Sequence, residues 1–147
     1  LDAIACADMI VLGPGSLYTS IIPNFLVDGI SEAITKSGAV KAYIMNILTQ
    51  DGETDGYTGE DHVRALIEHA GPGVVEVCIA NNRTVPEEYM TPYRKEGVAQ
   101  IELCREKIEA MGIAVREFPL SEGSRYIRHS PDELARAILA VWDEFKE

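Results

Sequence analysis

The sequence predicts an α/β fold with a mostly parallel sheet, and three observations support this prediction. Short continuous apolar runs, which are typical of strands buried on both faces, recur along the chain. Segments with apolar residues at helical spacing separate these runs. Long polar or Gly/Pro-rich loops follow them, where the carboxyl ends of strands would lie. Strands that alternate with helices in this way form parallel sheets with helices on their faces, so we expect a three-layer arrangement.

The strands and helices follow one another in a simple order. The apolar runs predict strands at residues 9–12, 40–48, 74–80 and 113–115. Helical spacing predicts helices at residues 23–36, 58–71, 99–111 and 130–145. Three stretches without regular pattern remain as loops, at residues 49–57, 81–97 and 120–129.

Two of these helices have recognisable starts. Thr58 is an N-cap candidate with Asp61 three residues later, which is the spacing of a capping box. Ser130 precedes Pro131 at the first helical position and Glu133 at the third. His62 follows Asp61; it could act as an acid or base, although a helix-start role is the commoner use of such a residue.

Composition limits the partners of the chain. Its 147 residues fit one α/β domain over 1–147, and 24 acidic against 13 basic residues give a net charge of −11. Such a surface repels nucleic acids and anionic membranes. No apolar run reaches 18 residues, so we expect no membrane span. Three widely spaced cysteines indicate free thiols and a cytoplasmic location rather than disulfides or a metal site.

The loop after the first strand is a candidate phosphate or carboxylate site. Its glycines let the backbone approach a ligand, and a helix start offers free N–H groups. Hydroxyls add further donors, while a tight strand-to-helix turn remains the alternative. The candidate residues are Gly13, Pro14, Gly15, Ser16, Thr19 and Ser20.

The loop after the second strand is rich in groups that bind hydroxyls or cations. Asn46, Thr49 and Gln50 are candidate ligand-binding residues. The alternating acidic residues lack the later Glu of an EF-hand, so calcium binding in that form is excluded. A loose Mg²⁺ site through Glu53 or Asp55 stays open, as does a solvated acidic turn.

Two further loops offer groups for an aromatic base. Asn81 ends the third strand and could pair with a base edge or simply shape a turn. Tyr93 could stack on a base. Residues 125–129 form a basic cluster in an acidic chain, and Arg128 could hold a base or a diphosphate. A solvated loop is the alternative, and no nucleophile or hydrolase motif is present.

Four segments resemble a known family. They are ADMIVLGPGSLYTSIIPNFLV, NILTQDGETDGYTGEDHV, NNRTVP and IRHSPDELA. They are similar to the bacterial YvcK group, the gluconeogenesis factors, in the superfamily of CofD-like proteins that also contains the 2-phospho-L-lactate transferases. The resemblance implies a Rossmann-like α/β fold and a position in the C-terminal half of a longer protein. Asp51 stands where the family usually has Pro, which we expect to affect loop rigidity.

The resemblance implies a nucleotide-sugar-binding regulator of carbon use and cell-wall precursor synthesis, with a UDP-sugar as ligand. It implies the diphosphate or sugar near Gly13 to Ser16 and Asn46, and the base near Asn81, Tyr93 and Arg128. The alternative is an enzyme, a phospholactate-type transferase that uses Mg²⁺ and a deazaflavin acceptor. A dinucleotide-binding domain is the third hypothesis. The exposed edge expected of a partial sheet favours assembly with further copies.

Overall fold

The computed structural model describes residues 1–123 and 126–146. Four strands form a sheet in the order β1-β2-β3-β4, and each neighbouring pair is parallel. The strands are β1 (Met9–Leu12), β2 (Val40–Ile44), β3 (Val77–Asn81) and β4 (Ala114–Phe118). The predicted α/β fold with a parallel sheet is therefore confirmed.

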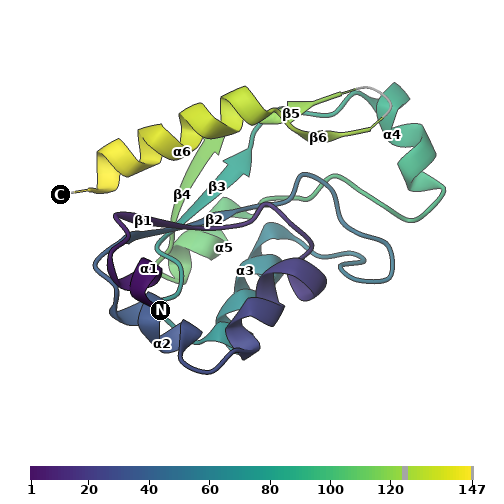
Figure 1. The fold of residues 1–147 in the computed structure, drawn as a ribbon. Helices are drawn as coiled ribbons and strands as arrows, with labels where there is room; N and C mark the ends of the chain where they lie inside the picture. Colours follow the sequence, from purple (N-terminus) through teal and green to yellow (C-terminus); the bar gives the residue numbers. More distant parts are fainter. Residues whose placement is uncertain (124–125, 147) are drawn as a thin grey trace.

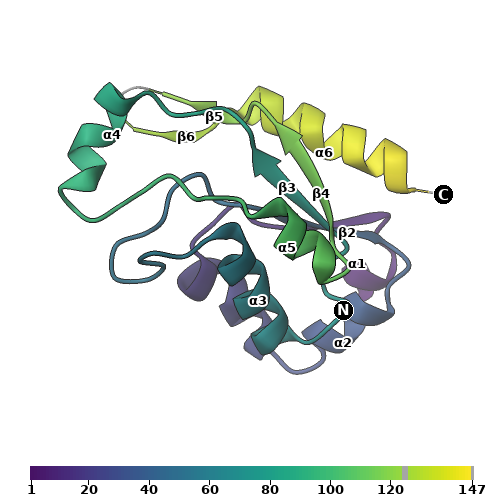
Figure 2. The ribbon, with the colours of Figure 1, turned by 180° about the vertical axis from the view of Figure 1, so that it is seen from behind.

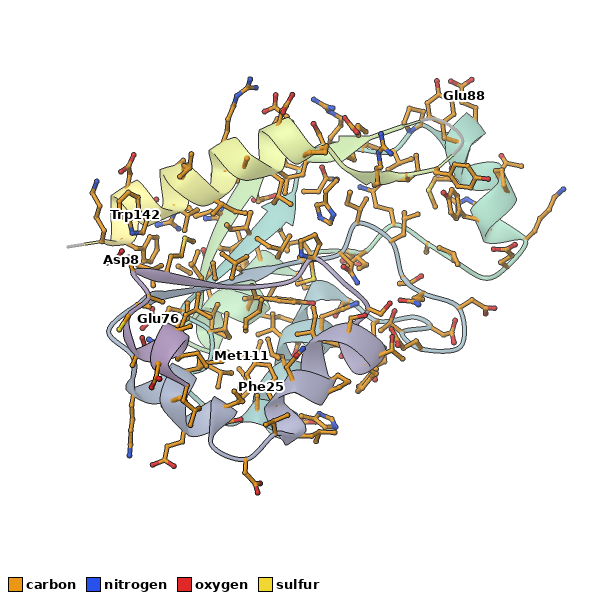
Figure 3. The ribbon with its side chains drawn as sticks, viewed as in Figure 1. Asp8, Phe25, Glu76, Glu88, Met111 and Trp142 are labelled. Atoms are coloured by element: carbon orange, nitrogen blue, oxygen red, sulfur yellow. The ribbon has the colours of Figure 1, made fainter. Side chains whose placement is uncertain are left out.

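Helices cover both faces of this sheet. One face carries α1 (Asp2–Ala5), η1 (Leu17–Ile21), η2 (Ile22–Leu26), α2 (Ile30–Lys36), α3 (Gly59–Ala70) and α5 (Arg105–Ala110). Of the helices in the described residues, α6 (Pro131–Phe145) covers the other face (Figures 1 and 2). Figure 3 shows Phe25 and Met111 on the side of α2 and α3, and Trp142 on α6.

The strands are buried from both sides, which explains their continuous apolar runs. Tyr43 and Cys78 belong to the core beneath α3 and α5. Ala42, Ile44 and Ile79 belong to the core beneath α6. Successive residues of a strand point to opposite faces, so both sets of side chains must be apolar.

A smaller unit lies beyond the carboxyl ends of the strands. It consists of α4 (Glu87–Arg94) and an antiparallel hairpin of β5 (Ser121–Glu122) and β6 (Arg128–His129), which lie side by side in both views (Figures 1 and 2). A third small core of Ile47, Val85 and Met90 holds this unit to the loop after β2. The sequence predicted only irregular loops here.

The expected helix at 23–36 is interrupted. The 3-10 turn η2 contains Pro23 and ends at Leu26, and α2 begins only at Ile30. Gly29 precedes α2 with φ of +83°, a left-handed conformation that breaks the helical path.

The expected helix at 99–111 forms only over Arg105–Ala110, so this prediction is wrong before residue 105. Ile101 N donates to Ile47 O at 3.0 Å, and Thr49 N donates to Ala99 O at 2.8 Å. These bonds tie the segment to the loop after β2, and a left-handed Cys104 (φ +53°) then starts α5. Hydrogen bonds between distant segments override the local helical spacing here.

The predicted capping box at α3 is confirmed. Thr58 Oγ1 accepts from Asp61 N at 3.3 Å, and Asp61 Oδ2 accepts from Thr58 N at 2.8 Å. These bonds hold the pKa of Asp61 below its ordinary value. The start of α6 after Ser130 is also confirmed, although the Ser130 side chain makes no capping bond.

Candidate functional site

The carboxyl ends of the parallel strands lie at one edge of the sheet, where open α/β proteins bind ligands. The loop after β1, the loop after β2 and the turn after β3 start there. The β5–β6 hairpin closes over the same end (Figure 1). Three of the four candidate segments therefore lie at one edge of the sheet. The hairpin brings Arg128, which belongs to the fourth segment, toward the same edge.

Asn46 joins the first two loops. Its Nδ2 donates to the carbonyl of Gly15 at 3.1 Å, and its Oδ1 accepts no hydrogen bond from the described residues. Gly13 has φ of +92° and a cis peptide bond to Pro14. A Cβ at Gly13 would lie 3.3 Å from Ile44 O, so the loop after β1 passes close over the end of β2. The side chain of Asn46 thereby fixes the path of the candidate phosphate loop.

The side-chain hydroxyls of the residues beside this loop are available to bind a ligand. Ser16 precedes η1 and makes no side-chain capping bond, while its carbonyl accepts from Ser20 N and Ile21 N at 2.9 and 3.0 Å. Thr19 and Ser20 are exposed. A cavity of about 400 Å³ borders Gly13, Pro14 and Ser20 along the outer side of β1.

The candidates of the second loop have different roles. Thr49 is buried; its Oγ1 accepts from Ala99 N at 2.9 Å and donates to Ala99 O at 3.3 Å. Its hydroxyl therefore holds the loop in place. Gln50 is exposed; its backbone N–H donates to Thr54 Oγ1 at 2.9 Å, while its side chain makes no hydrogen bond to the described residues. Of this group, Asn46 and Gln50 have side-chain groups left for a ligand.

Asn81 shapes the turn after β3. Its Oδ1 accepts from the backbone N–H groups of Leu120 (3.0 Å), Ser121 (2.9 Å) and Arg83 (3.2 Å), and its Nδ2 donates to Arg83 O at 2.7 Å. One N–H of the amide is left for another partner. The structure thus gives Asn81 a positioning role for the β4–β5 connection.

A cavity of about 330 Å³ lies between this turn, α4 and the hairpin. Its lining includes Arg83, Tyr89, Ser121, Glu122 and Ile127. Tyr89, rather than the predicted Tyr93, supplies the aromatic ring. The Tyr93 hydroxyl instead accepts from Ile127 N at 2.9 Å and so holds the hairpin against α4. No spacing in the sequence distinguishes the two tyrosines.

Opposite charges lie beside this cavity. Arg128 Nε donates to Glu122 Oε1 at 3.1 Å, and Arg83 Nη1 donates to Ser121 O at 2.8 Å. Arg128 is exposed and can reorient toward a ligand. Arg125, the other arginine of the basic cluster, lies outside the described residues.

His129, the last residue of the predicted basic cluster, lies at the same edge of the sheet but was not among the predicted ligand-binding residues. Its Nε2 donates to Met45 O at 3.0 Å, which places the ring over the end of β2, next in sequence to Asn46. Burial lowers the pKa of His129 below its ordinary value of 6.5, so the neutral ring is favoured. Its sequence signals are its place in the basic cluster at residues 125–129 and in the segment IRHSPDELA.

The acidic residues do not form a cation site within the part of the chain that is described. Asp55 is exposed, and its Oδ2 accepts from Gly52 N at 2.9 Å. No three His, Cys, Asp or Glu side chains among the described residues gather so that they could hold a metal ion.

Comparison with known proteins identifies the family of this chain. A family model described as 2-phospho-L-lactate transferase CofD matches residues 1–121. The chain belongs to the CofD family. A crystal structure of a UPF0052-family protein from Bacillus halodurans superposes with a TM-score of 0.91 and 40% sequence identity, over 94% of this chain.

Curated relatives of this CofD-family chain are named gluconeogenesis factor, which confirms the resemblance. The relative from Halalkalibacterium halodurans is 41% identical over 140 residues, or 95% of this chain. The relatives from Listeria innocua and Bacillus subtilis are 44% and 39% identical over 96% and 98% of it.

The chain spans less than half the length of these relatives. It covers 44%, 43% and 46% of the three, and 45% of the superposed crystal chain. No helix in the described ranges is long and apolar enough to cross a membrane.

Proposed function

We propose that this chain contributes part of a nucleotide-sugar site in a cytoplasmic regulatory protein, with a UDP-sugar as ligand. The main support for this proposal is the hydrogen bond from Asn46 Nδ2 to Gly15 O, which joins two candidate loops at one edge of the sheet. The names of the relatives, gluconeogenesis factor, support a role in central carbon metabolism. A link to cell-wall precursor synthesis follows from the chemistry of such a ligand and is part of the proposal.

The diphosphate is proposed to lie at the loop after β1. Gly13 and Gly15 carry no side chain that would hinder close approach, and the Ser16 hydroxyl makes no capping bond. The sugar would then lie near Asn46 and Gln50, whose amide groups suit hydroxyls.

The base is proposed to lie in the 330 Å³ cavity beside Tyr89, close to Arg128. Tyr93, Asn81 and Thr49 hold the surrounding backbone through the bonds given above. An anionic ligand would compete with Glu122 for the Arg128 guanidinium.

The rest of the site is proposed to come from outside this chain. Among the described residues β1 pairs only with β2, so its outer edge is open. Val11 on β1 is 38% exposed, although it stands in an apolar run. Since the relatives are about twice as long, we propose that the chain is the C-terminal half of a CofD-like protein whose remainder covers this edge. Assembly into a homo-oligomer is a separate part of the proposal.

A phospholactate-type transferase is the second candidate, because the matching family model carries that description. Mg²⁺ is usually held by one or two carboxylates together with waters and phosphates, so Glu53 or Asp55 would be the ligands proposed from this chain. Turnover with a deazaflavin acceptor in the presence of Mg²⁺ would favour it over a purely regulatory protein.

Titration calorimetry on the protein at its natural length tests the proposed function. We expect a UDP-sugar to bind, and Arg128→Ala to weaken binding about tenfold, the loss of one charge-assisted contact. Arg136→Ala is the matched control, because Arg136 is an exposed arginine on α6 that pairs with Glu133 at 2.8 Å. Absence of heat with every UDP-sugar, or equal losses in both variants, would contradict the proposal.

A further inference from the structure

We propose that Arg83 and Ser121 determine which base the cavity of about 330 Å³ accepts, and that they select uracil over cytosine. The inference rests on the proposed function, which puts the base of a nucleotide sugar in this cavity. It starts from two members of the cavity lining that lack partners among the described residues. One is an arginine without a carboxylate, and the other is a buried hydroxyl without a hydrogen bond.

Arg83 brings a positive charge to the cavity that no described carboxylate neutralises. Every other arginine that the structure describes pairs with at least one aspartate or glutamate side chain. The chain has 24 acidic and 13 basic residues, so an arginine without such a pair is unusual in it. Because a guanidinium only donates hydrogen bonds, the ligand atom that faces Arg83 has to be an acceptor.

Hydrogen bonds hold Arg83 in place and leave most of its side-chain donors unused. Its carbonyl accepts from Asn81 Nδ2 at 2.7 Å and from Gln100 Nε2 at 3.0 Å. On the side chain, Nη1 donates to Ser121 O at 2.8 Å, so the other N–H groups of the guanidinium can bind a ligand. The bonds to the carbonyl do not involve the guanidinium, and a substitution at Arg83 should therefore keep the path of the turn.

Ser121 adds a buried hydroxyl to the same lining. The residue is 5% exposed and lies in β5, where its backbone N–H donates to Asn81 Oδ1 at 2.9 Å. Its hydroxyl makes no hydrogen bond to the described residues. A hydroxyl can donate and accept, and a buried one without a partner costs free energy. A ligand in the cavity would supply that partner.

The remaining lining suits the flat faces of a base. Its carboxylate, Glu122, is held by Arg128, whose Nε donates to Oε1 at 3.1 Å. The polar edge of a bound base would therefore meet Arg83 and Ser121 rather than a free carboxylate. Apolar and aromatic side chains would contact the ring faces, and they belong to Val85, Pro86, Tyr89 and Ile127.

Uracil and cytosine differ at this polar edge. Uracil has a carbonyl oxygen at C4 and an N–H at N3, whereas cytosine has an amino group at C4 and a bare acceptor at N3. The guanidinium of Arg83 would donate to the uracil carbonyl, and the Ser121 hydroxyl would accept from its N–H. With cytosine, the amino group would face the donors of Arg83, so both would lose their hydrogen bonds. Buried polar groups left unpaired in this way give strong discrimination between ligands.

Calorimetry on the protein at its natural length tests this selection with two ligands that share one sugar. They are the UDP-sugar that binds in the experiment above and the CDP-sugar with the same sugar. We expect the unaltered protein to prefer the UDP-sugar by about tenfold or more. Arg83→Gln should weaken UDP-sugar binding about tenfold and reduce the preference to about threefold or less, because a glutamine amide both donates and accepts.

The ratio of the two affinities separates selection from a merely structural effect, which would lower both affinities by the same factor. Ser121→Ala should also reduce this ratio, because it removes the acceptor for the uracil N–H. The control is Arg94→Gln, since Arg94 is an exposed arginine of α4 outside the cavity lining that pairs with Glu87 at 2.7 Å. It should leave both affinities within about twofold of the original.

The outcomes distinguish this inference from the proposed function. Equal affinities for the two ligands in the unaltered protein, or a ratio that Arg83→Gln leaves unchanged, would overturn the inference and leave the nucleotide-sugar site in place. The absence of binding by every UDP-sugar would contradict the proposed function and this inference together.

Discussion

The side chain of Asn46 donates to the backbone carbonyl of Gly15 at 3.1 Å, across 31 positions of sequence. This bond joins the end of β2 to the glycine turn after β1. The geometry of the candidate phosphate loop therefore depends on a residue of a neighbouring loop.

Removal of this amide should weaken ligand binding more than it weakens the fold. We expect Asn46→Ala to lower the affinity for a UDP-sugar about tenfold, since both an amide contact and the fixed loop are lost. Calorimetry measures the affinity. Asn82→Ala is the control, because Asn82 is an exposed asparagine whose side chain makes no hydrogen bond to the described residues. The affinity of this variant should stay within about twofold of the original. Equal losses would contradict the role of Asn46.

Gly59 has no room for a side chain. Its N–H donates to Glu102 O at 2.8 Å, and a Cβ there would overlap the carbonyl oxygen of Leu103. Gly59→Ala should reduce the free energy of unfolding by about 2 kcal/mol through overpacking. Denaturant unfolding measures the loss. Gly38→Ala should change it little, because a Cβ at Gly38 meets nothing within 4 Å.

The capping box at α3 should contribute measurable stability. Thr58→Ala removes the bond from Asp61 N and should cost about 1 kcal/mol of unfolding free energy. Ser130→Ala, at the start of α6, should cost under about 0.5 kcal/mol, because Ser130 makes no side-chain capping bond. If both variants lose the same amount in thermal unfolding, the capping bond does not explain the stability of α3.

Tyr43 is buried in the core with a hydroxyl that has no partner among the described residues. Burial also raises its pKa. Tyr43→Phe removes an unsatisfied polar atom and keeps the ring. We therefore expect the melting temperature to stay the same or rise, which corresponds to a gain of up to about 1 kcal/mol in the free energy of unfolding. Tyr18→Phe should lower it instead, since its hydroxyl bonds Tyr57. A marked loss of stability in Tyr43→Phe would reveal a partner for its hydroxyl.

Stability should fall as the solution becomes mildly acidic. Burial lowers the folded-state pKa of His62 and His129 below 6.5, so the unfolded chain binds more protons below that pH. Their contribution is therefore full above pH 6.5 and is lost as the pH falls toward the folded-state values. Melting temperatures at pH 7.5, 6.5 and 5.5 should show the fall, and a double variant with Gln at both positions should show a flatter curve. An equally steep curve would place the acid sensitivity elsewhere.

The sequence predicts the layers well because they depend on local periodicity. The strands that begin at Met9 and Val40 and the helix that follows Thr58 all match. The error at 99–104 comes from long-range bonds such as Ile101 N to Ile47 O, which leave no mark on local spacing. The helix Glu87–Arg94 was missed because Pro92 lies inside it, and prolines usually end helices.

The sequence predicted where the candidate loops lie, but only partly how their side chains are used. The predicted strand ends placed these loops at one edge of the sheet, because parallel strands share one carboxyl side. The sequence could not show that Thr49 and Asn81 use their polar groups on distant backbone, through Ala99, Leu120 and Ser121. His129 was missed as a site residue for the same reason, since its contact with Met45 spans 84 positions.

The most direct test of the account is a map of ligand-induced shifts in the amide NMR spectrum of the protein at its natural length. With a UDP-sugar added, we expect the largest shifts at the amides of Gly13, Gly15 and Ser16 and at the side-chain amide of Asn46. Residues that line the cavity beside Tyr89 should shift with the same saturation curve. Shifts confined to other surfaces, or a spectrum unchanged at saturating UDP-sugar, would contradict the proposed site.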